Sequence, residues 1–326
     1  MARFALLAAA CSVAAALSTG FALAQTNAYP ARPVRFISPF PPGGAVDVVT
    51  RIVAAGLGET WGQQVVVDNR GGAGGTIGAD VAAKAQPDGY TILSGGIATH
   101  GIAPVLYRKL PYDPVRDFTP ISMIGTTPNV LVVNPSVPVK TVAEFIAYAK
   151  SAPGKLNYGS PGIGTSPQLT MELFKLMAGV DLVHVPYKGN ALALSDLLGG
   201  QIPAMFDNLP GQMAMIRAGR VRVLGVSSAK RHPSIPDVPT IAESGIPGFE
   251  VKVWYAVFAS GKPPKDVVAR LVAATRKAID SPETQKRLNE QGVDPGSSSP
   301  EELAAFASGE MVKWGKVVKD AGLPRQ

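Results

Sequence analysis

Strand-like and helix-like segments alternate along almost the whole of this chain of 326 residues. Apolar runs suited to buried strands are followed by turns and then by helical patterns, and three helices, at 264–280, 282–291 and 300–320, are predicted to close the chain. A capping box, Ser299 to Glu302, opens the last of them. Such alternation predicts an α/β fold with mostly parallel sheets flanked by helices. Ligands of these folds bind beyond the carboxyl ends of the strands.

The clearest unit is VRFISPFPPGGAVDVVTR, residues 34–51. It reads as a buried strand from Val34 to Phe40, a Pro-Gly turn, and a helix with Val46, Val49, Val53 and Leu57 on one face. A glycine turn that leads into a helix leaves main-chain N–H groups unpaired at the positive end of the helix dipole, which suits an anion. The alternative is a plain strand-to-helix turn with no ligand.

A second unit of the same kind is YGSPGIGTSPQLT, residues 158–170. A strand ends near Ser160, a glycine loop follows, and Ser166 is predicted to cap a helix with Pro167 at its first position. The segment fits neither a P-loop nor a dinucleotide fingerprint nor an esterase elbow. It predicts a second anion-binding turn, or else a routine helix cap.

No catalytic or metal-binding pattern is evident. The histidines, His100, His184 and His232, lie far apart and lack ligand spacing, so neither a metal nor a cofactor is expected. The predicted structural role of Asp47 is to complement the helix dipole or to pair with Arg51 at i+4, and its predicted functional role is to hold the turn or to contact a donor group of the ligand. Asp207 ends a strand and is predicted to face a cleft, because burial of an unpartnered carboxylate is costly.

The amino-terminal segment predicts export. Arg3 is followed by an apolar run and then by Ala22-Leu23-Ala24, which is typical of a signal peptide at 1–24 cleaved after Ala24. Cys11 is the only cysteine and lies inside this segment, so the alternative is lipoprotein processing there. The net charge of +7 is scattered rather than clustered, which argues against nucleic-acid binding.

Many ordered segments resemble the solute-binding receptors of tripartite tricarboxylate transporters, the Bug-type periplasmic proteins. They include PFPPGGAVD (39–47), VVVDNRGGAGGTIG (65–78), LPYDPVRDFTPI (110–121), YGSPGIGTS (158–166), VPYKG (185–189) and DVPTIAESGIPGFE (237–250). The resemblance covers essentially the whole mature chain.

This resemblance implies a two-domain periplasmic binding protein of the Venus-flytrap, type II-like kind. Domain 1 would be discontinuous, 25–126 and 248–326, and domain 2 would span 127–247, with crossings near 125–129 and 246–251. The ligand would be a small organic acid, namely a di- or tricarboxylate, an acidic amino acid or an aromatic acid. The expected ligand-binding residues are Phe40, Pro42, Gly43, Gly44, Asp47, Gly95, Gly96, Thr99, Ser160, Gly164, Thr165, Lys188, Gly189 and Asp207.

The same resemblance implies a non-enzymatic, monomeric receptor that delivers its ligand to membrane transporter subunits. Two alternatives remain: a receptor that signals to a sensor kinase, and an exported hydrolase, against which the lack of a nucleophile–base motif argues. Two departures from the family pattern leave the ligand's identity open. Gln168 stands where the family usually has His, and Gly71 stands where it usually has Pro.

Overall fold

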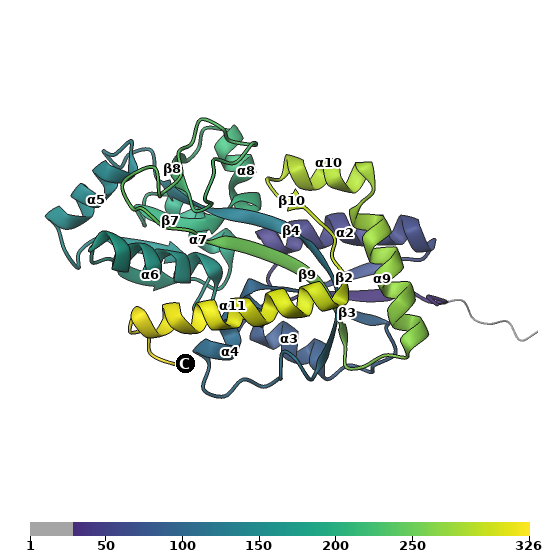
Figure 1. The fold of residues 1–326 in the computed structure, drawn as a ribbon. Coiled ribbons are helices and arrows are strands. Elements are labelled where there is room, and N and C mark those ends of the chain that lie inside the picture. Colours follow the sequence, from purple (N-terminus) through teal and green to yellow (C-terminus); the bar gives the residue numbers. More distant parts are fainter. Residues whose placement is uncertain (1–28) are drawn as a thin grey trace, which may run out of the picture.

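Two long strands, β4 (Phe118–Val133) and β9 (Lys252–Ser260), run antiparallel through the middle of the molecule (Figure 1). They are seen in a computed structural model that describes residues 29–326. The predicted signal peptide, with Cys11, lies outside the described residues. None of the helices within residues 29–326 has both the length and the apolar character that a membrane span requires.

The strands form one sheet with the order β2-β1-β3-β9-β4-β7-β5-β6, and β8 and β10 also pair with β4. The other strands are β1 (Val34–Ser38), β2 (Val65–Asn69), β3 (Thr91–Gly96), β5 (Asn157–Ser160), β6 (Val183–Pro186), β7 (Ala204–Asn208), β8 (Arg222–Val226) and β10 (Asp294–Pro295).

Helices cover the sheet. They are α2 (Ala45–Trp61), α3 (Thr76–Ala83), α4 (Ala103–Leu106), α5 (Val142–Ser151), α6 (Ser166–Ala178), α7 (Asn190–Leu198), α8 (Leu209–Arg217), α9 (Lys265–Ile279), α10 (Pro282–Glu290) and α11 (Pro300–Asp320), with a 3₁₀ turn η1 (Ala73–Gly75) and a π-helix η2 (Ile97–Ile102). The three predicted closing helices are confirmed as α9, α10 and α11, and the capping box at Ser299 and Glu302 is present.

The α/β binding-protein fold is confirmed, but the sheet is mixed rather than mostly parallel. β1 pairs in parallel with β2 and β3, and β5 with β6 and β7. β4 is antiparallel to β9, β7 and β8. The reason is that β4 and β9 connect the two parts of the fold. β9 runs antiparallel to β3 at the edge of one parallel unit, and β4 runs antiparallel to β7 at the edge of the other.

The partner of β4 changes along its length. Residues up to Pro128 pair with β9, and residues from Asn129 pair with β7. We call β2, β1, β3, β9 and β4 up to Pro128 the first half of the sheet, and the remaining strands with β4 from Asn129 the second half. The chain passes back from the second half to the first near Val251, whose N–H donates to the Ser227 carbonyl at 2.8 Å. The domain boundaries at 126/127 and 247/248 stay a prediction.

Apolar spacing explains how the helices near the site are held. Of the predicted face of α2, Val49, Val53 and Leu57 are fully inaccessible, whereas Val46 in the first turn is only partly buried. The helix ends at Gly62, whose left-handed φ of 61° suits glycine. At the other end of the chain, Trp314 of α11 is buried, and Glu310 accepts hydrogen bonds from the indoles of Trp254 and Trp314, both at 3.1 Å. These contacts fix α11 against β9.

Candidate ligand-binding site

The turn between β1 and α2 is held from beneath by Asp47. Its Oδ2 accepts a hydrogen bond from the Gly43 N–H at 3.0 Å, and its Oδ1 lies 3.0 Å from the Arg51 guanidinium. Burial alone would raise the pKa of Asp47, but the hydrogen bonds from Arg51, Gly43 and Asn69 lower it below its usual value. Asp47 therefore pairs with Arg51 and holds the turn, which are two of the roles predicted for it.

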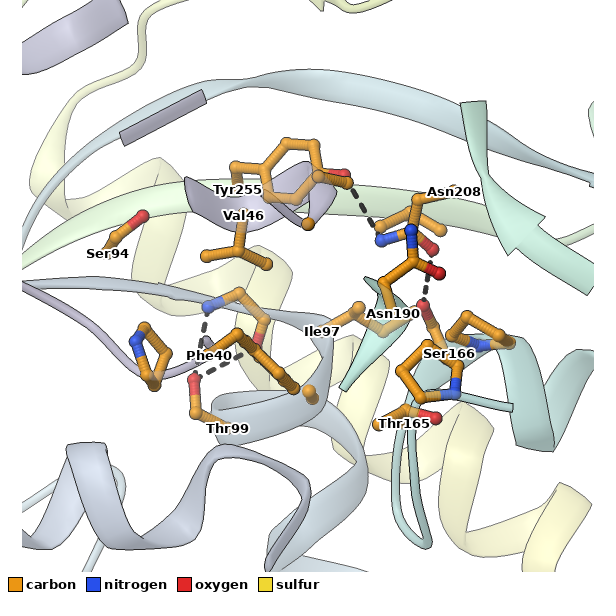
Figure 2. A pocket seen from close by; sticks show the side chains of 18 of the residues that line it. Phe40, Val46, Ser94, Ile97, Thr99, Thr165, Ser166, Asn190, Asn208 and Tyr255 are labelled. Atoms are coloured by element: carbon orange, nitrogen blue, oxygen red, sulfur yellow. Dashed lines mark hydrogen bonds between the residues drawn. The ribbon is translucent and has the colours of Figure 1, made fainter. Parts of the chain in front are cut away.

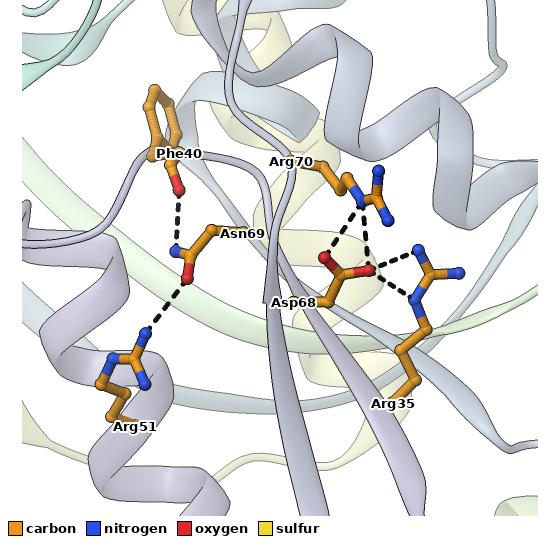
Figure 3. A network of polar contacts seen from close by, with 6 residues as sticks. All are labelled: Arg35, Phe40, Arg51, Asp68, Asn69 and Arg70. Carbon is orange, nitrogen blue, oxygen red and sulfur yellow. Dashed lines mark hydrogen bonds and ion pairs between the residues drawn. The ribbon is translucent and has the colours of Figure 1, made fainter.

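Asn69, at the end of β2, fixes the same turn from the neighbouring strand (Figure 3). Its Nδ2 donates to the Phe40 carbonyl at 2.9 Å and to Asp47 Oδ1 at 2.8 Å, and its Oδ1 accepts from Arg51 at 3.1 Å. Gly43 has a φ of 83°, which only glycine adopts without strain. The start of α2 is thus rigidly placed, and the N–H groups of its first turn have no partner within the helix.

The loop before α6 satisfies many of its own polar groups. The Ser160 hydroxyl accepts from the Gly162 N–H at 3.1 Å and lies 2.6 Å from Nε2 of His184. The Gly164 N–H donates to Oε1 of Gln168 at 2.7 Å, and the Thr165 hydroxyl donates to the Gly162 carbonyl at 2.7 Å. The expected donors Ser160 and Gly164 are therefore engaged inside the loop.

The predicted cap of α6 is wrong by one residue. Thr165 occupies the cap position, and Ser166 is the first helical residue. The hydroxyl of Ser166 instead donates to Oδ1 of Asn208 at 3.0 Å. Ser166 is thereby directed across the cleft floor toward β7 rather than back onto its own helix.

A cavity lies between the two halves of the sheet, where the starts of α2, α6 and α7 meet (Figure 2). Its lining residues are Pro39, Phe40, Pro41, Gly44, Ala45, Val46, Ser94, Gly95, Gly96, Ile97, Ala98, Thr99, Pro161, Thr165, Ser166, Pro167, Asn190, Asp207, Asn208, Val253, Trp254 and Tyr255. Among these described residues there is no lysine and no arginine. An anion held here would be compensated by helix starts and neutral donors.

Asn208 connects both halves of the sheet across this cavity. Its Nδ2 donates to the Tyr255 hydroxyl of β9 at 3.2 Å, while its Oδ1 accepts from Ser166 of α6. Figure 2 shows these two bonds meeting at the Asn208 amide. All three side chains are buried, so the network sets the distance between the two walls.

Asp207 is the buried carboxyl of the cavity, only 3% exposed. Its Oδ1 accepts from the Asn208 N–H at 2.8 Å and its Oδ2 from Nε2 of Gln212 at 2.7 Å. Burial raises the pKa of Asp207 to about 7, and the hydrogen bonds from Gln212, Asn208 and Asn190 only partly oppose this rise. The prediction that Asp207 faces a cleft agrees with its place in the cavity wall.

The structure separates the expected ligand-binding residues into three groups. The cavity is lined by Phe40, Gly44, Gly95, Gly96, Thr99, Thr165 and Asp207. A wider outer cleft, next to it and again bordered by Phe40, is lined by Pro42, Lys188 and Gly189. Neither set of lining residues includes Gly43, Asp47, Ser160 and Gly164, which support the walls from behind.

Several residues that line the cavity were not predicted from the sequence. Asn190 is the first residue of α7 and directly follows the VPYKG segment. Its place next to that segment could have identified it as a cavity residue. Asn208 follows Asp207 at the end of β7 and could have been found in the same way. Tyr255 and Ser94 lie within apolar strands, where sequence alone gives no sign that they face a cavity.

The Ser160–His184 contact is a serine–histidine pair that the sequence did not reveal. Ser160 is fully buried and is not among the residues lining either space, and the imidazole stacks on the Tyr158 ring at 4.8 Å. Burial lowers the pKa of His184 to about 4. The pair holds the loop end of β5 in place.

Comparison with known proteins decides the family. The model described as the tripartite tricarboxylate transporter family receptor matches residues 49–323. The chain belongs to this receptor family. A UPF0065 protein of Pseudomonas sp. strain P51 is 44% identical over 94% of this chain and 91% of its own length. BugT of Bordetella pertussis is 38% identical over 91% of this chain and 92% of its own.

Solved structures of relatives share the fold of this receptor. A protein of R. palustris solved with adipate is 40% identical, with a TM-score of 0.88 over 90% of this chain and 98% of that one. MatC from Rhodopseudomonas palustris, with bound malate, is 35% identical, with a TM-score of 0.83 over 89% of this chain and 100% of that one. The periplasmic binding protein BugD is 37% identical, with a TM-score of 0.88 over 91% of this chain and 100% of that one. These relatives are solute-binding proteins, not enzymes, so the hydrolase alternative is set aside.

Proposed function

We propose that this receptor captures a small organic carboxylate in the periplasm and delivers it to the membrane subunits of a tripartite tricarboxylate transporter. The observation that carries the proposal is the cavity between the two halves of the sheet, where three helix starts meet and the described lining holds no basic side chain. Main-chain N–H groups at such starts favour an anion, each by roughly 0.3–1 kcal/mol when exposed and up to about 2 when partly buried.

The relatives support a carboxylate as the ligand. One was solved with adipate and another with malate, and both cover about nine-tenths of this chain. The side chains of Phe40, Val46 and Ile97 also give the cavity an apolar surface, against which a short carbon chain would pack.

The experiment is a thermal-shift screen of mono-, di- and tricarboxylates, acidic amino acids and aromatic acids, followed by calorimetry on the compounds that raise the melting temperature. Residues 25–326 would be used. We expect one or more saturable binders with no chemical change in the recovered compound. Absence of binding across the panel, or decarboxylation or hydrolysis of a bound compound, would contradict the proposal.

Delivery to a transporter and export through a cleaved signal peptide are tested separately. Deleting the gene should reduce uptake of the bound carboxylate as much as deleting the membrane subunits does; an unchanged uptake with a lost transcriptional response would favour a sensor kinase instead. Intact mass of the periplasmic protein should place its first residue at Gln25. A lipid-modified Cys11 would overturn that processing.

A further inference from the structure

Two buried side chains that carry hydrogen-bond acceptors, Asn190 and Asp207, line the cavity. Asn190 is 8% exposed and Asp207 is 3% exposed, and both line the cavity. Within residues 29–326, no donor meets Oδ1 of Asn190. A buried acceptor without a donor costs about 1–3 kcal/mol, so a partner from outside the described chain is favoured at this point.

Asp207 and Asn190 flank one small volume. A Cβ placed on Gly211 would lie 2.9 Å from Asp207 Oδ2 and 3.1 Å from Asn190 Nδ2. Asn190 thus turns its amide nitrogen toward the Asp207 side and leaves its oxygen unpaired. An ionised carboxyl offers about four acceptor sites, more than the bonds from Gln212, Asn208 and Asn190 fill.

The two amide side chains next to Asp207 in the chain and in space are already engaged. The Asn208 amide is already bonded to Tyr255 and Ser166 on its two sides. The Gln212 amide nitrogen donates to Asp207 itself. Among the described lining residues no lysine or arginine can approach the carboxyl, and a buried carboxylate without a cation or further donor is unfavourable.

We propose that Asn190 and Asp207 form an acceptor subsite for an N–H or O–H group of the ligand, so that the preferred ligand is an amino- or hydroxy-carboxylate rather than an unsubstituted dicarboxylate. The inference rests on the proposed function, because the ligand's carboxylate is taken to occupy the helix starts. The starts of α2 and α6 then offer donors to the ligand's carboxylate, and the acceptors beside the start of α7 face its amine or hydroxyl.

The test uses matched carbon skeletons on residues 25–326. Calorimetry compares succinate, malate and aspartate, and then adipate, 2-hydroxyadipate and 2-aminoadipate. Within at least one skeleton, the member with a hydroxyl or amine should bind about tenfold or more tightly than the unsubstituted acid, as expected for one buried hydrogen bond to a charged or unpaired acceptor. Preference for the amine alone would show that an ionised Asp207 pairs with an ammonium; equal preference for the hydroxyl would show that a neutral donor suffices.

Variants test whether this preference depends on Asn190 and Asp207. Asn190→Ala should reduce the advantage of the substituted acid to less than about threefold, measured as the ratio of the dissociation constants of the two acids in the same variant. Asn157→Ala, at an exposed asparagine at the start of β5, is the matched control and should change neither value. Circular dichroism confirms that each variant folds, and the wild-type comparison stands even if Asn190→Ala does not fold.

Failure of the acceptor subsite and failure of the proposed function give different results. If succinate or adipate binds and the substituted acids bind no more tightly, the acceptor subsite is wrong and the proposed function survives. If none of the six compounds nor the wider acid panel binds, the proposed function fails and the subsite fails with it. An advantage that persists unchanged in Asn190→Ala and in Asp207→Asn would also overturn the assignment.

Discussion

Gly164 donates its amide hydrogen to Oε1 of Gln168, 2.7 Å away, at the start of α6. The glycine has a φ of 80° and lies in the loop that the sequence predicts to be an anion-binding turn. Because Gln168 takes this N–H, the side chain replaces an external acceptor at that position. The departure from the family pattern at position 168 therefore has a local structural role. The N–H groups that the first turn of α6 leaves for a ligand are those of Ser166 and Gln168, because Pro167 has no N–H and the Leu169 N–H donates to the Thr165 carbonyl at 3.1 Å.

Gln168→Ala should destabilise the protein by about 1 kcal/mol, as for loss of a helix amino-terminal cap. A shift of about 1.5–2 °C in the melting temperature is expected for a chain of this size. Gln168→Glu keeps an acceptor and is the control. Equal stability of the Ala variant and the wild type in urea unfolding would show that the bond contributes nothing.

Gly74→Ala should weaken ligand binding through closure of the cleft. A Cβ at Gly74 would lie 2.6 Å from the carbonyl oxygen of Ile163, which belongs to the opposite half. Gly62→Ala is matched, because Gly62 has nearly the same φ, 61° against 62°, and nothing within 4 Å of its Cβ. Both variants should lose about 1–2 kcal/mol of stability from the left-handed backbone.

Only Gly74→Ala should also lose affinity, by about tenfold or more, since a less populated closed state lowers apparent affinity in proportion. Calorimetry with one bound carboxylate measures the difference. Equal affinities for the two variants would mean that contact between these loops does not limit binding.

His100 should make the protein sensitive to acid. Burial lowers its pKa from 6.5 to about 3, and its ring stacks on Phe258 at 3.8 Å. The unfolded chain binds a proton below pH 6.5 while the folded one does not, so this contribution to stability is present above pH 6.5 and is lost as the pH falls toward 3.

Relative to His100→Phe, the wild type should lose about 2–3 kcal/mol of unfolding free energy between pH 7.5 and 4.5. Urea unfolding at several pH values measures the two slopes. Any constant offset from repacking the Phe ring does not affect the comparison, and parallel slopes would refute the role of His100.

Asp207 should affect the pH dependence of stability in the direction opposite to His100. Its folded pKa, about 7, lies above the ordinary value of 3.8 because of burial. Between these values the folded protein binds more protons than the unfolded chain, so stability falls as the pH rises from about 4 to 7. Asp207→Asn should remove this fall, which is about 4 kcal/mol for the full shift. If wild type and variant keep a constant difference in unfolding free energy across that range, Asp207 is ionised throughout.

The sequence predicted the elements better than the contacts within the site. Apolar spacing located α2 and α9 to α11, and the paired Pro-Gly and glycine turns located two of the cavity walls. The directions of β4 and β9 were missed, because a buried strand reads alike whether its partners are parallel or antiparallel. Tyr255 was missed for a related reason: an aromatic side chain in an apolar strand resembles a core residue until the Asn208 bond is seen.

The Ser160–His184 and Gly164–Gln168 bonds were missed because side-chain partners depend on χ angles and tertiary packing, which the order of residue types does not encode. Asp47 shows the opposite case. Its i+4 spacing to Arg51 predicted an ion pair, and the structure contains that ion pair together with the bond to Gly43.

The central claim is that helix starts in this cavity hold a carboxylate by its charge. The most direct measurement is a calorimetric titration of the tightest-binding acid beside the same compound with its carboxylates converted to primary amides. The account predicts saturable one-to-one binding of the acid and about tenfold or more weaker binding of the amide, because charge-assisted hydrogen bonds are roughly twice as strong as neutral ones. Equal affinity for acid and amide would contradict it.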